Sequence, residues 1–164
     1  MNLTRRRVLA VLVVLVTAAD WLSKFWIQNR MYLGEVRPVV DGWVFLAHRR
    51  NTGVAFSMFA GAPSYWRIVA LTLAGVVGMS VCARLIASTR DAVLRFAATL
   101  VLAGALGNLG DRVLNGGVTD FILVRFFPFV FNVADVAITV GGILLVARLV
   151  LGEERTEAEA PAAV

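Results

Sequence analysis

The sequence has 164 residues, of which 59% are hydrophobic and 16% are charged, and its mean hydropathy is +0.79. This composition excludes an ordinary soluble domain and indicates one compact integral membrane protein. The net charge of +5 favours attraction to anionic lipid headgroups over nucleic-acid binding, because no dense basic patch is interleaved with aromatic residues.

Four apolar stretches are candidates to cross a hydrocarbon layer of about 30 Å, which takes roughly 20 residues. The third is short, so its ends are the least well defined. We expect a membrane α-helical fold with four transmembrane helices, in which residues 1–151 form a single integral-membrane domain. The predicted helices cover residues 8 to about 27, 65–86, 94 to about 109, and 129–151.

The first stretch, RRRVLAVLVVLVTAAD, also resembles a cleaved secretory signal, with a basic start, an apolar run and small residues at its end. Apolar and aromatic residues resume after Asp20 in WLSKFWI, which favours a retained first span. The cleaved signal remains the alternative interpretation.

The orientation is expected to follow the Lys and Arg residues. With both termini inside, the 16 basic residues divide evenly between the two sides. The run Arg5–Arg7 directly abuts the first span and favours a cytoplasmic N-terminus. We therefore expect both termini in the cytoplasm.

Residues 28–64 interrupt the helical pattern with several glycines and prolines. Within them, RPVVDGWVFLAH has the β-branched and aromatic content of strands around an Asp41-Gly42 turn. We expect a small β-sheet on the outer membrane surface, with Trp43 and Phe45 resting on lipid. The polar, acidic residues 152–164 are predicted to form a disordered cytoplasmic tail.

Polar residues at the outer ends of the spans are informative, since an ionised group near the membrane centre costs on the order of 3 kcal/mol. In DWLSK, Asp20 and Lys24 are four residues apart and can pair on one helix face, a pair that structure alone would also explain. In NTGVAF, Asn51 lies near Gly53, which allows close backbone approach, although a simple turn would explain this motif too.

Three further motifs bring aspartates towards one place. In GNLGDRV, the helical spacing lets Asn108, Asp111 and Arg112 face one direction, and Arg112 is expected to hold the Asp111 carboxylate ionised. VTDF then supplies Asp120 in the connection to the last span, and FNVAD supplies Asp135. In the last motif Asn132 and Asp135 share a helix face, so all these groups can converge.

Two neighbouring aspartates can share one proton, so that one accepts a proton from water while the other donates to a scissile carbonyl. This chemistry needs no metal, cofactor or covalent intermediate. Other hydrolytic designs fit poorly, because Cys82 is the only cysteine, His48 is the only histidine, and neither HExxH nor GxSxG occurs.

The motifs NTGVAF, GNLGDRV, VTDF and FNVADVAI, in this order on a four-span chain, resemble lipoprotein signal peptidase, the type II signal peptidase of bacteria. The resemblance covers about residues 8–150, and DWLSK also matches the family pattern. Gly110 departs from it, because some members carry an aromatic residue there, which leaves the local packing open.

The resemblance implies an inner-membrane aspartic endopeptidase whose catalytic residues are Asp120 and Asp135, with its site on the extracytoplasmic side. Its partners would be membrane lipids and prolipoproteins, cut just before a diacylglyceryl-modified cysteine, and the cyclic peptide globomycin would inhibit it. We expect a monomer. The residues implied to line or brace the site are Asn51, Gly53, Asn108, Asp111, Arg112, Asn132 and Ala134, supported by Asp20 and Lys24.

A small transporter or channel that uses buried aspartates is the rival hypothesis. Polar residues would then continue through the membrane, yet VAITVGGILLVA below Asp135 contains no relay. Polar groups that merely bridge helices in a structural subunit are the third possibility.

Overall fold

The computed structural model describes residues 3–53 and 64–158. Within these residues it contains four helices that are long and apolar enough to span a membrane, as predicted. They are α1 (Leu3–Arg30), α2 (Ser64–Ser88), α3 (Ala92–Asn115) and α4 (Val133–Ala158). The first stretch packs into the bundle, where Thr17 Oγ1 on α1 donates to the carbonyl oxygen of Ala103 on α3 at 3.2 Å.

The third helix runs further than the sequence predicts, to Asn115 and not to about residue 109. It ends where Gly116 adopts a left-handed conformation with φ of 68° and its N–H bonds to the Arg112 carbonyl, a common helix C-terminus. The GNLGDRV motif therefore lies inside the helix.

The fourth helix begins later and ends later than predicted. It starts at Val133 and not at Phe129, because Asn132 caps it, and it continues beyond Leu151 to Ala158. The prediction of disorder from residue 152 is therefore wrong up to Ala158, where Glu, Arg and Ala favour helix continuation. Residues 159–164 of that predicted tail lie outside the described residues.

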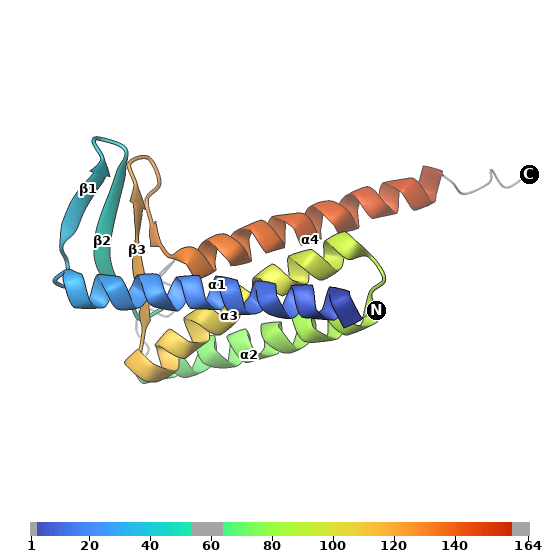
Figure 1. The fold of residues 1–164 in the computed structure, drawn as a ribbon, viewed down its shortest axis with the longest axis horizontal. Coiled ribbons are helices and arrows are strands. Elements are labelled where there is room, and N and C mark those ends of the chain that lie inside the picture. The colour runs from blue at the N-terminus through green and yellow to red at the C-terminus, as the bar shows by residue number, and fades with distance from the viewer. Residues whose placement is uncertain (1–2, 54–63, 159–164) are drawn as a thin grey trace, which may run out of the picture.

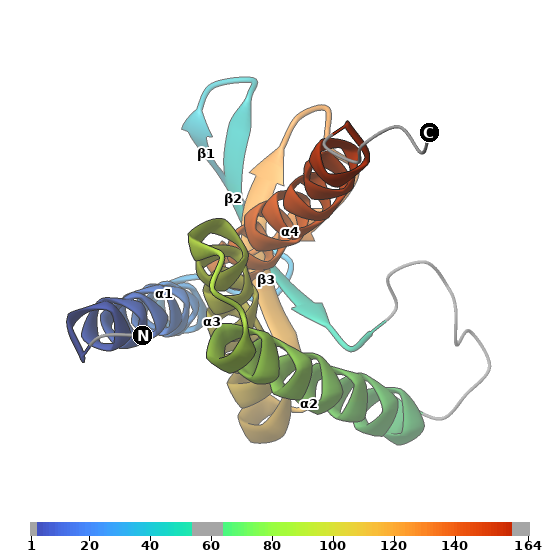
Figure 2. The same ribbon diagram turned by 90° about the vertical axis from the view of Figure 1, so that its right-hand side faces the viewer.

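The third helix lies at the centre of the bundle and contacts each of the other three (Figure 2). Close packing depends on small residues: a Cβ atom added to Gly104 of α3 would collide with the carbonyl oxygen of Ala134 on α4. In the same interface the glycine can also come from α4: a Cβ atom added to Gly141 would lie 2.7 Å from the carbonyl oxygen of Ala97 on α3. Such contacts are typical of helix interfaces in membranes.

An antiparallel sheet stands across one end of the bundle, opposite the start of α1 and the end of α4 (Figure 1). The predicted hairpin around Asp41-Gly42 is confirmed, and Gly42 has the positive φ of 73° that its turn requires. The strand order follows the sequence, with β1 (Val36–Val40), β2 (Val44–Asn51), β3 (Val118–Val124) and β4 (Val130–Phe131).

Two of these strands, β3 and β4, are not predicted from the sequence. Asp120 lies in the connection between the last two spans, as expected, and within it on β3. β3 pairs with β2 over most of its length and places Asp120 opposite Arg49. The sheet thus joins the surface segment to the link between α3 and α4. Residues 54–63 of the predicted surface segment lie outside the described residues.

Candidate active site

The start of α4 holds Asp135 through a reciprocal pair of hydrogen bonds. Asn132 Oδ1 accepts from the backbone N–H of Asp135 at 2.9 Å, and Asp135 Oδ2 accepts from the backbone N–H of Asn132 at 3.2 Å. In this capping box the N-cap residue and the third helical residue satisfy each other's backbone donors. Asp135 is thereby fixed in the first turn, where the helix dipole stabilises a carboxylate.

Asp120 lies beside it on β3, with only 3% of its surface exposed. Its Oδ1 atom accepts from Asn132 Nδ2 at 2.7 Å, and its Oδ2 atom accepts from Asn51 Nδ2 at 3.0 Å. Burial and the nearby charge of Asp135 raise the pKa of Asp120 to about 6, against the effect of these two donors. Since Asn132 binds both carboxyl groups, it ties the two aspartates together.

Asn51 is oriented by a tight turn at the end of β2. Its Oδ1 atom accepts from the backbone N–H of Gly53 at 2.9 Å, which leaves Nδ2 to donate to Asp120. Gly53 has a φ of 92°, a conformation that side chains disfavour. Asn51 and Gly53 therefore form one turn, which orients the Asn51 amide towards Asp120.

A buried charged network lies on the other side of Asp135. Lys24 Nζ is 2.7 Å from Asp20 Oδ2, so the predicted pair within α1 is confirmed, and it also donates to Asn108 Oδ1 at 2.8 Å. Asn108 Nδ2 donates to Asp135 Oδ1 at 2.8 Å. Asp20 Oδ1 accepts from the backbone N–H of Ala134 at 2.9 Å, so this network also anchors the start of α4.

The predicted pairing of Arg112 with Asp111 is wrong. Asp111 accepts from Asn115 Nδ2 at 2.7 Å and from the Thr119 backbone N–H at 2.6 Å, and it lies 3.9 Å from Lys24 Nζ. Consecutive helical residues point about 100° apart, so Asp111 faces the bundle while Arg112 faces the pocket. Asp111 remains a brace, but its partners differ from the predicted one.

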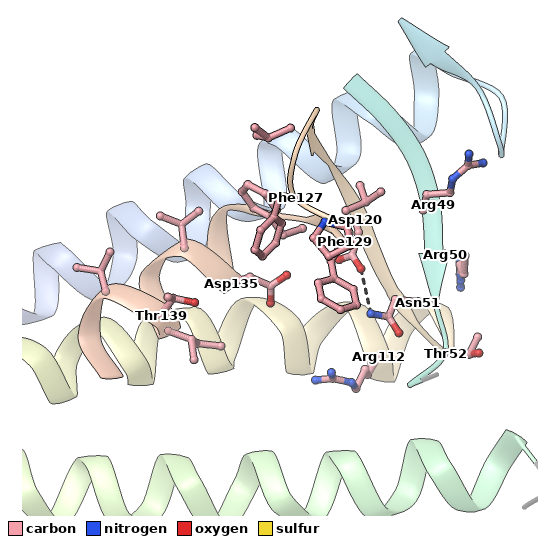
Figure 3. A pocket seen from close by; sticks show the side chains of 17 residues that line it. Arg49, Arg50, Asn51, Thr52, Arg112, Asp120, Phe127, Phe129, Asp135 and Thr139 are labelled. Carbon is pink, nitrogen blue, oxygen red and sulfur yellow. Dashed lines mark hydrogen bonds between the residues drawn. The ribbon is translucent and has the colours of Figure 1, made fainter. Parts of the chain in front are cut away.

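A pocket of about 980 Å³ opens in front of the two aspartates (Figure 3). Asp120, Asp135, Asn51 and Arg112 line its polar part. The apolar part consists of aromatic residues from the β3–β4 hairpin and of one face of α4. It includes Phe127, Phe129, Phe131, Val136, Ile138 and Val140.

This aromatic wall is absent from the sequence-based predictions, although FFPFVF at residues 126–131 carries a visible signal. Its rings contact one another edge to face, with the centroids of Phe127 and Phe129 5.7 Å apart and those of Phe127 and Phe131 5.6 Å apart. The aromatic content that suggests a membrane span instead forms the hairpin and the pocket wall.

The packing around Gly110 has an explanation in α1. A Cβ atom at Gly110 would collide with the indole ring of Trp21, whose Nε1 donates to the Gly107 carbonyl at 3.2 Å. A tryptophan from the neighbouring helix therefore occupies the space beside this glycine. The departure from the family pattern leaves no gap at this position.

The side chains of Cys82 and His48, which could also take part in catalysis, do not line the pocket. Cys82 is buried on α2 and does not line the pocket. His48 Nδ1 lies 2.9 Å from the Met31 carbonyl oxygen, within the sheet region. Over residues 3–53 and 64–158, no three His, Cys, Asp or Glu side chains are arranged to hold a metal ion.

The family model described as signal peptidase II matches residues 12–151 of this chain. The lipoprotein signal peptidase of Streptococcus pyogenes serotype M6 is 36% identical over 143 residues, which cover 87% of this chain and 92% of that protein. The lipoprotein signal peptidase of Syntrophus aciditrophicus is 36% identical over 141 residues, covering 83% and 88% respectively.

Solved structures agree with these sequence matches. A bacterial membrane enzyme solved by the in meso method at 2.3 Å resolution superposes with a TM-score of 0.81 at 26% identity, covering 96% of this chain and 94% of that one. A second, at 1.9 Å resolution, gives a TM-score of 0.78 at 26% identity, covering 87% and 92%.

Proposed function

This chain belongs to the signal peptidase II family, and we propose that Asp120 and Asp135 are the catalytic pair with which it removes signal peptides from prolipoproteins. The enzyme is an aspartic peptidase of the bacterial inner membrane, as its family and its four apolar helices indicate. The proposal concerns the residues that cut, the bond that is cut and the side of the membrane.

The observation that supports this pair is the bridging contact of Asn132. One side chain and its own backbone N–H bind both carboxyl groups, and both carboxyl groups open onto the same pocket. Two carboxylates so placed cannot both ionise cheaply, and the raised pKa of Asp120 fits a pair that shares one proton.

The reaction then needs only water and the pair. One carboxylate takes a proton from water as the water oxygen bonds to the scissile carbonyl carbon, and the other carboxyl group gives its proton to the carbonyl oxygen. The tetrahedral intermediate collapses when the C–N bond breaks: the leaving nitrogen takes the first proton, and the second carboxyl group regains its own. The pair ends in its starting state.

The neighbouring polar groups suit the task of orientation. Asn51 and Arg112 line the pocket and exchange no proton near neutral pH. We therefore propose that they bind the backbone of the substrate peptide or stabilise the charge that develops on the scissile carbonyl oxygen. The aromatic and α4 wall matches an apolar substrate, which fits a peptide bond next to a diacylglyceryl-modified cysteine. Globomycin, as an inhibitor, would occupy the same pocket.

The site lies at the end of the bundle that carries the sheet, opposite the start of α1 (Figure 1). If Arg5–Arg7 keep the N-terminus in the cytoplasm, the pocket faces the extracytoplasmic side, where Trp43 can rest on lipid. A reporter that works only outside the cytoplasm should be active when fused near Arg37 and silent near Thr89. Activity near Thr89 would reverse this orientation.

A transporter has no observation in its favour. Along α3, residues 100–107 carry no charged side chain between the site and the opposite end, so the described polar residues form no relay across the bundle. We assign the aspartates to hydrolysis and propose that the monomer is the working unit.

Mass spectrometry of a lipidated preprotein incubated with the purified chain tests this function. We expect one cut, directly before the lipidated cysteine, that globomycin blocks. The same preprotein without the diacylglyceryl group is the control and should remain whole. Equal cleavage of both forms, or a cut at another bond, would contradict the proposed specificity.

A further inference from the structure

A second group of charges lies behind the catalytic pair and does not line the pocket. Lys24 is 3% exposed, and its ammonium contacts Asp20 Oδ2 at 2.7 Å and Asn108 Oδ1 at 2.8 Å, with Asp111 Oδ2 at 3.9 Å. An ammonium group this deeply buried is costly unless it is paired. The ion pair with Asp20 would suffice to compensate the buried charge, yet the contact with Asn108 leads on to Asp135.

The contact with Asn108 decides how its amide is oriented. An ammonium group only donates hydrogen bonds, so the group of Asn108 that faces Lys24 must be the carbonyl oxygen. The NH₂ group is then forced towards Asp135, where Nδ2 donates to Oδ1 at 2.8 Å. Without Lys24, the amide could rotate and present its oxygen to the carboxylate.

The two aspartates consequently differ in their surroundings. Asp135 receives a donor polarised by an ammonium group and a backbone N–H at the positive end of α4. Asp120 receives two neutral side-chain amides, one from Asn51 (Figure 3) and one from Asn132. Among the described residues, Asp20 on α1, Arg112 on α3 and Asp120 on β3 interact electrostatically with Asp135. Lys24 on α1 and Asp111 on α3 belong to the buried network behind it, and Arg49 and Arg50 on β2 line the same pocket.

We propose that Lys24 is a positioning residue for cleavage, which through Asn108 holds the Asp135 carboxylate in place, so that Asp135 takes the proton from water and Asp120 supplies the proton to the carbonyl. The raised pKa of Asp120 agrees with this division. The inference rests on the proposed function, since it assigns roles within that catalytic pair.

Steady-state kinetics of lipidated preprotein cleavage, measured with the full chain across the pH range, tests the inference. Lys24→Met should lower kcat at least tenfold with KM within about twofold, because Lys24 does not touch substrate. It should also displace the acidic limb of the kcat profile, because the Asn108 amide would no longer be held with its NH₂ group towards Asp135.

Two variants separate positioning from packing. Asp20→Asn/Lys24→Met removes both buried charges and keeps an acceptor for the Ala134 N–H, so it should fold but keep the lowered kcat and the displaced limb. Arg148→Met breaks an ion pair of the same 2.7 Å length at the other end of the bundle, and it should leave kcat and the profile unchanged. Wild-type kcat and profile in the double variant would overturn the inference.

Infrared difference spectroscopy provides a readout that does not depend on Lys24 variants folding. The carboxylic-acid band of the pair, recorded near pH 6, should vanish in Asp120→Asn and persist in Asp135→Asn. The opposite result would overturn the division of roles. If the wild-type chain failed to cut the lipidated preprotein, the proposed function would fail instead, and the band would still report which aspartate holds the proton.

Discussion

Both ends of the bundle contain a carboxylate at the start of a helix, but the two carboxylates do different work. At the end opposite the sheet, Asp91 caps α3 by accepting from the N–H groups of Val93 and Leu94, and it binds Arg148 Nε at 2.7 Å. These partners lower the pKa of Asp91, with the bond from Leu94 contributing most. Both of its carboxylate oxygens are bound, and it does not line the pocket.

At the end that carries the sheet, Asn132 caps α4, and Asp135 takes the third helical position with one side open to the pocket. A second carboxyl group lies beside it, buried, with its pKa raised to about 6. The N-terminus of a helix is therefore enough to stabilise a carboxylate, but it does not make that carboxylate catalytic. Proton transfer also requires a second, poorly ionised carboxyl group and access to substrate.

Removal of the second carboxyl group is expected to have the largest effect. Asn is nearly isosteric with Asp but cannot take up and return a proton, so Asp120→Asn should abolish cleavage of lipidated preprotein while the chain still inserts and binds globomycin. Asp91→Asn is the matched control at the end opposite the sheet and should keep the wild-type rate. Equal losses in both variants, measured in one assay, would mean that each aspartate is only structural.

The polar groups that line the pocket should matter less than the pair. Arg112→Ala should slow cleavage by roughly 10²–10³-fold, comparable to the loss of one oxyanion donor and equivalent to about 2.7–4 kcal/mol. The slow rate should remain measurable in a long incubation followed by mass spectrometry. A wild-type rate would place Arg112 outside the site, despite its position on the pocket wall.

The pH profile distinguishes the two pocket carboxylates from Asp91. The folded-state pKa of Asp120 is raised, so its proton is present below about pH 6 and is lost as the pH rises through that value. The rate constant kcat/KM should therefore fall about tenfold per pH unit above the apparent pKa of the pair.

Asn51→Ala sharpens this test, because it removes a donor that stabilises the ionised form of Asp120. Its alkaline limb should lie at higher pH than that of the wild type, on top of a lower maximal rate. An unchanged limb would show that Asp120 does not set the alkaline side of the profile.

At the end opposite the sheet the expected effect is on stability alone. Arg148→Met removes the ion pair to the Asp91 cap and should lower the free energy of unfolding only slightly, because both side chains are partly exposed to solvent. Thermal unfolding in detergent measures this loss. A substantial drop in kcat would mean that the two ends are coupled.

The smallest effect is expected at Cys82, which is buried on α2 away from the pocket. Cys82→Ala should retain full activity, with or without a chelator in the assay, because the proposed mechanism uses neither a thiol nor a metal ion. Loss of cleavage under either condition would count against the aspartic mechanism.

The sequence predicts the features that local patterns determine. The four helices follow from apolar length, the hairpin from Asp41-Gly42, and the pair of Asp20 and Lys24 from their spacing. The capping box also has a local signal, because Asn132 and Asp135 are three residues apart in FNVAD.

Long-range partners carry no such signal. The strand β3 forms against β2, and the contact between Asn51 and Asp120 joins residues 69 positions apart. Spacing places Asp111 and Arg112 near one another on α3, but it does not reveal that Lys24, Asn115 and Thr119 surround Asp111. The orientation of Arg112 into the pocket depends on packing around α3, which periodicity alone does not specify.

The rate of a single turnover by Asp135→Asn tests the catalytic pair most directly. With enzyme in excess over lipidated preprotein, the variant should release no signal peptide by mass spectrometry under conditions in which the wild-type chain cuts all of it, and it should still bind globomycin. Cleavage by Asp135→Asn at about a tenth of the wild-type rate would show that this carboxylate transfers no proton, because a catalytic base contributes 10²-fold or more. Asp135 would then be a structural cap like Asp91.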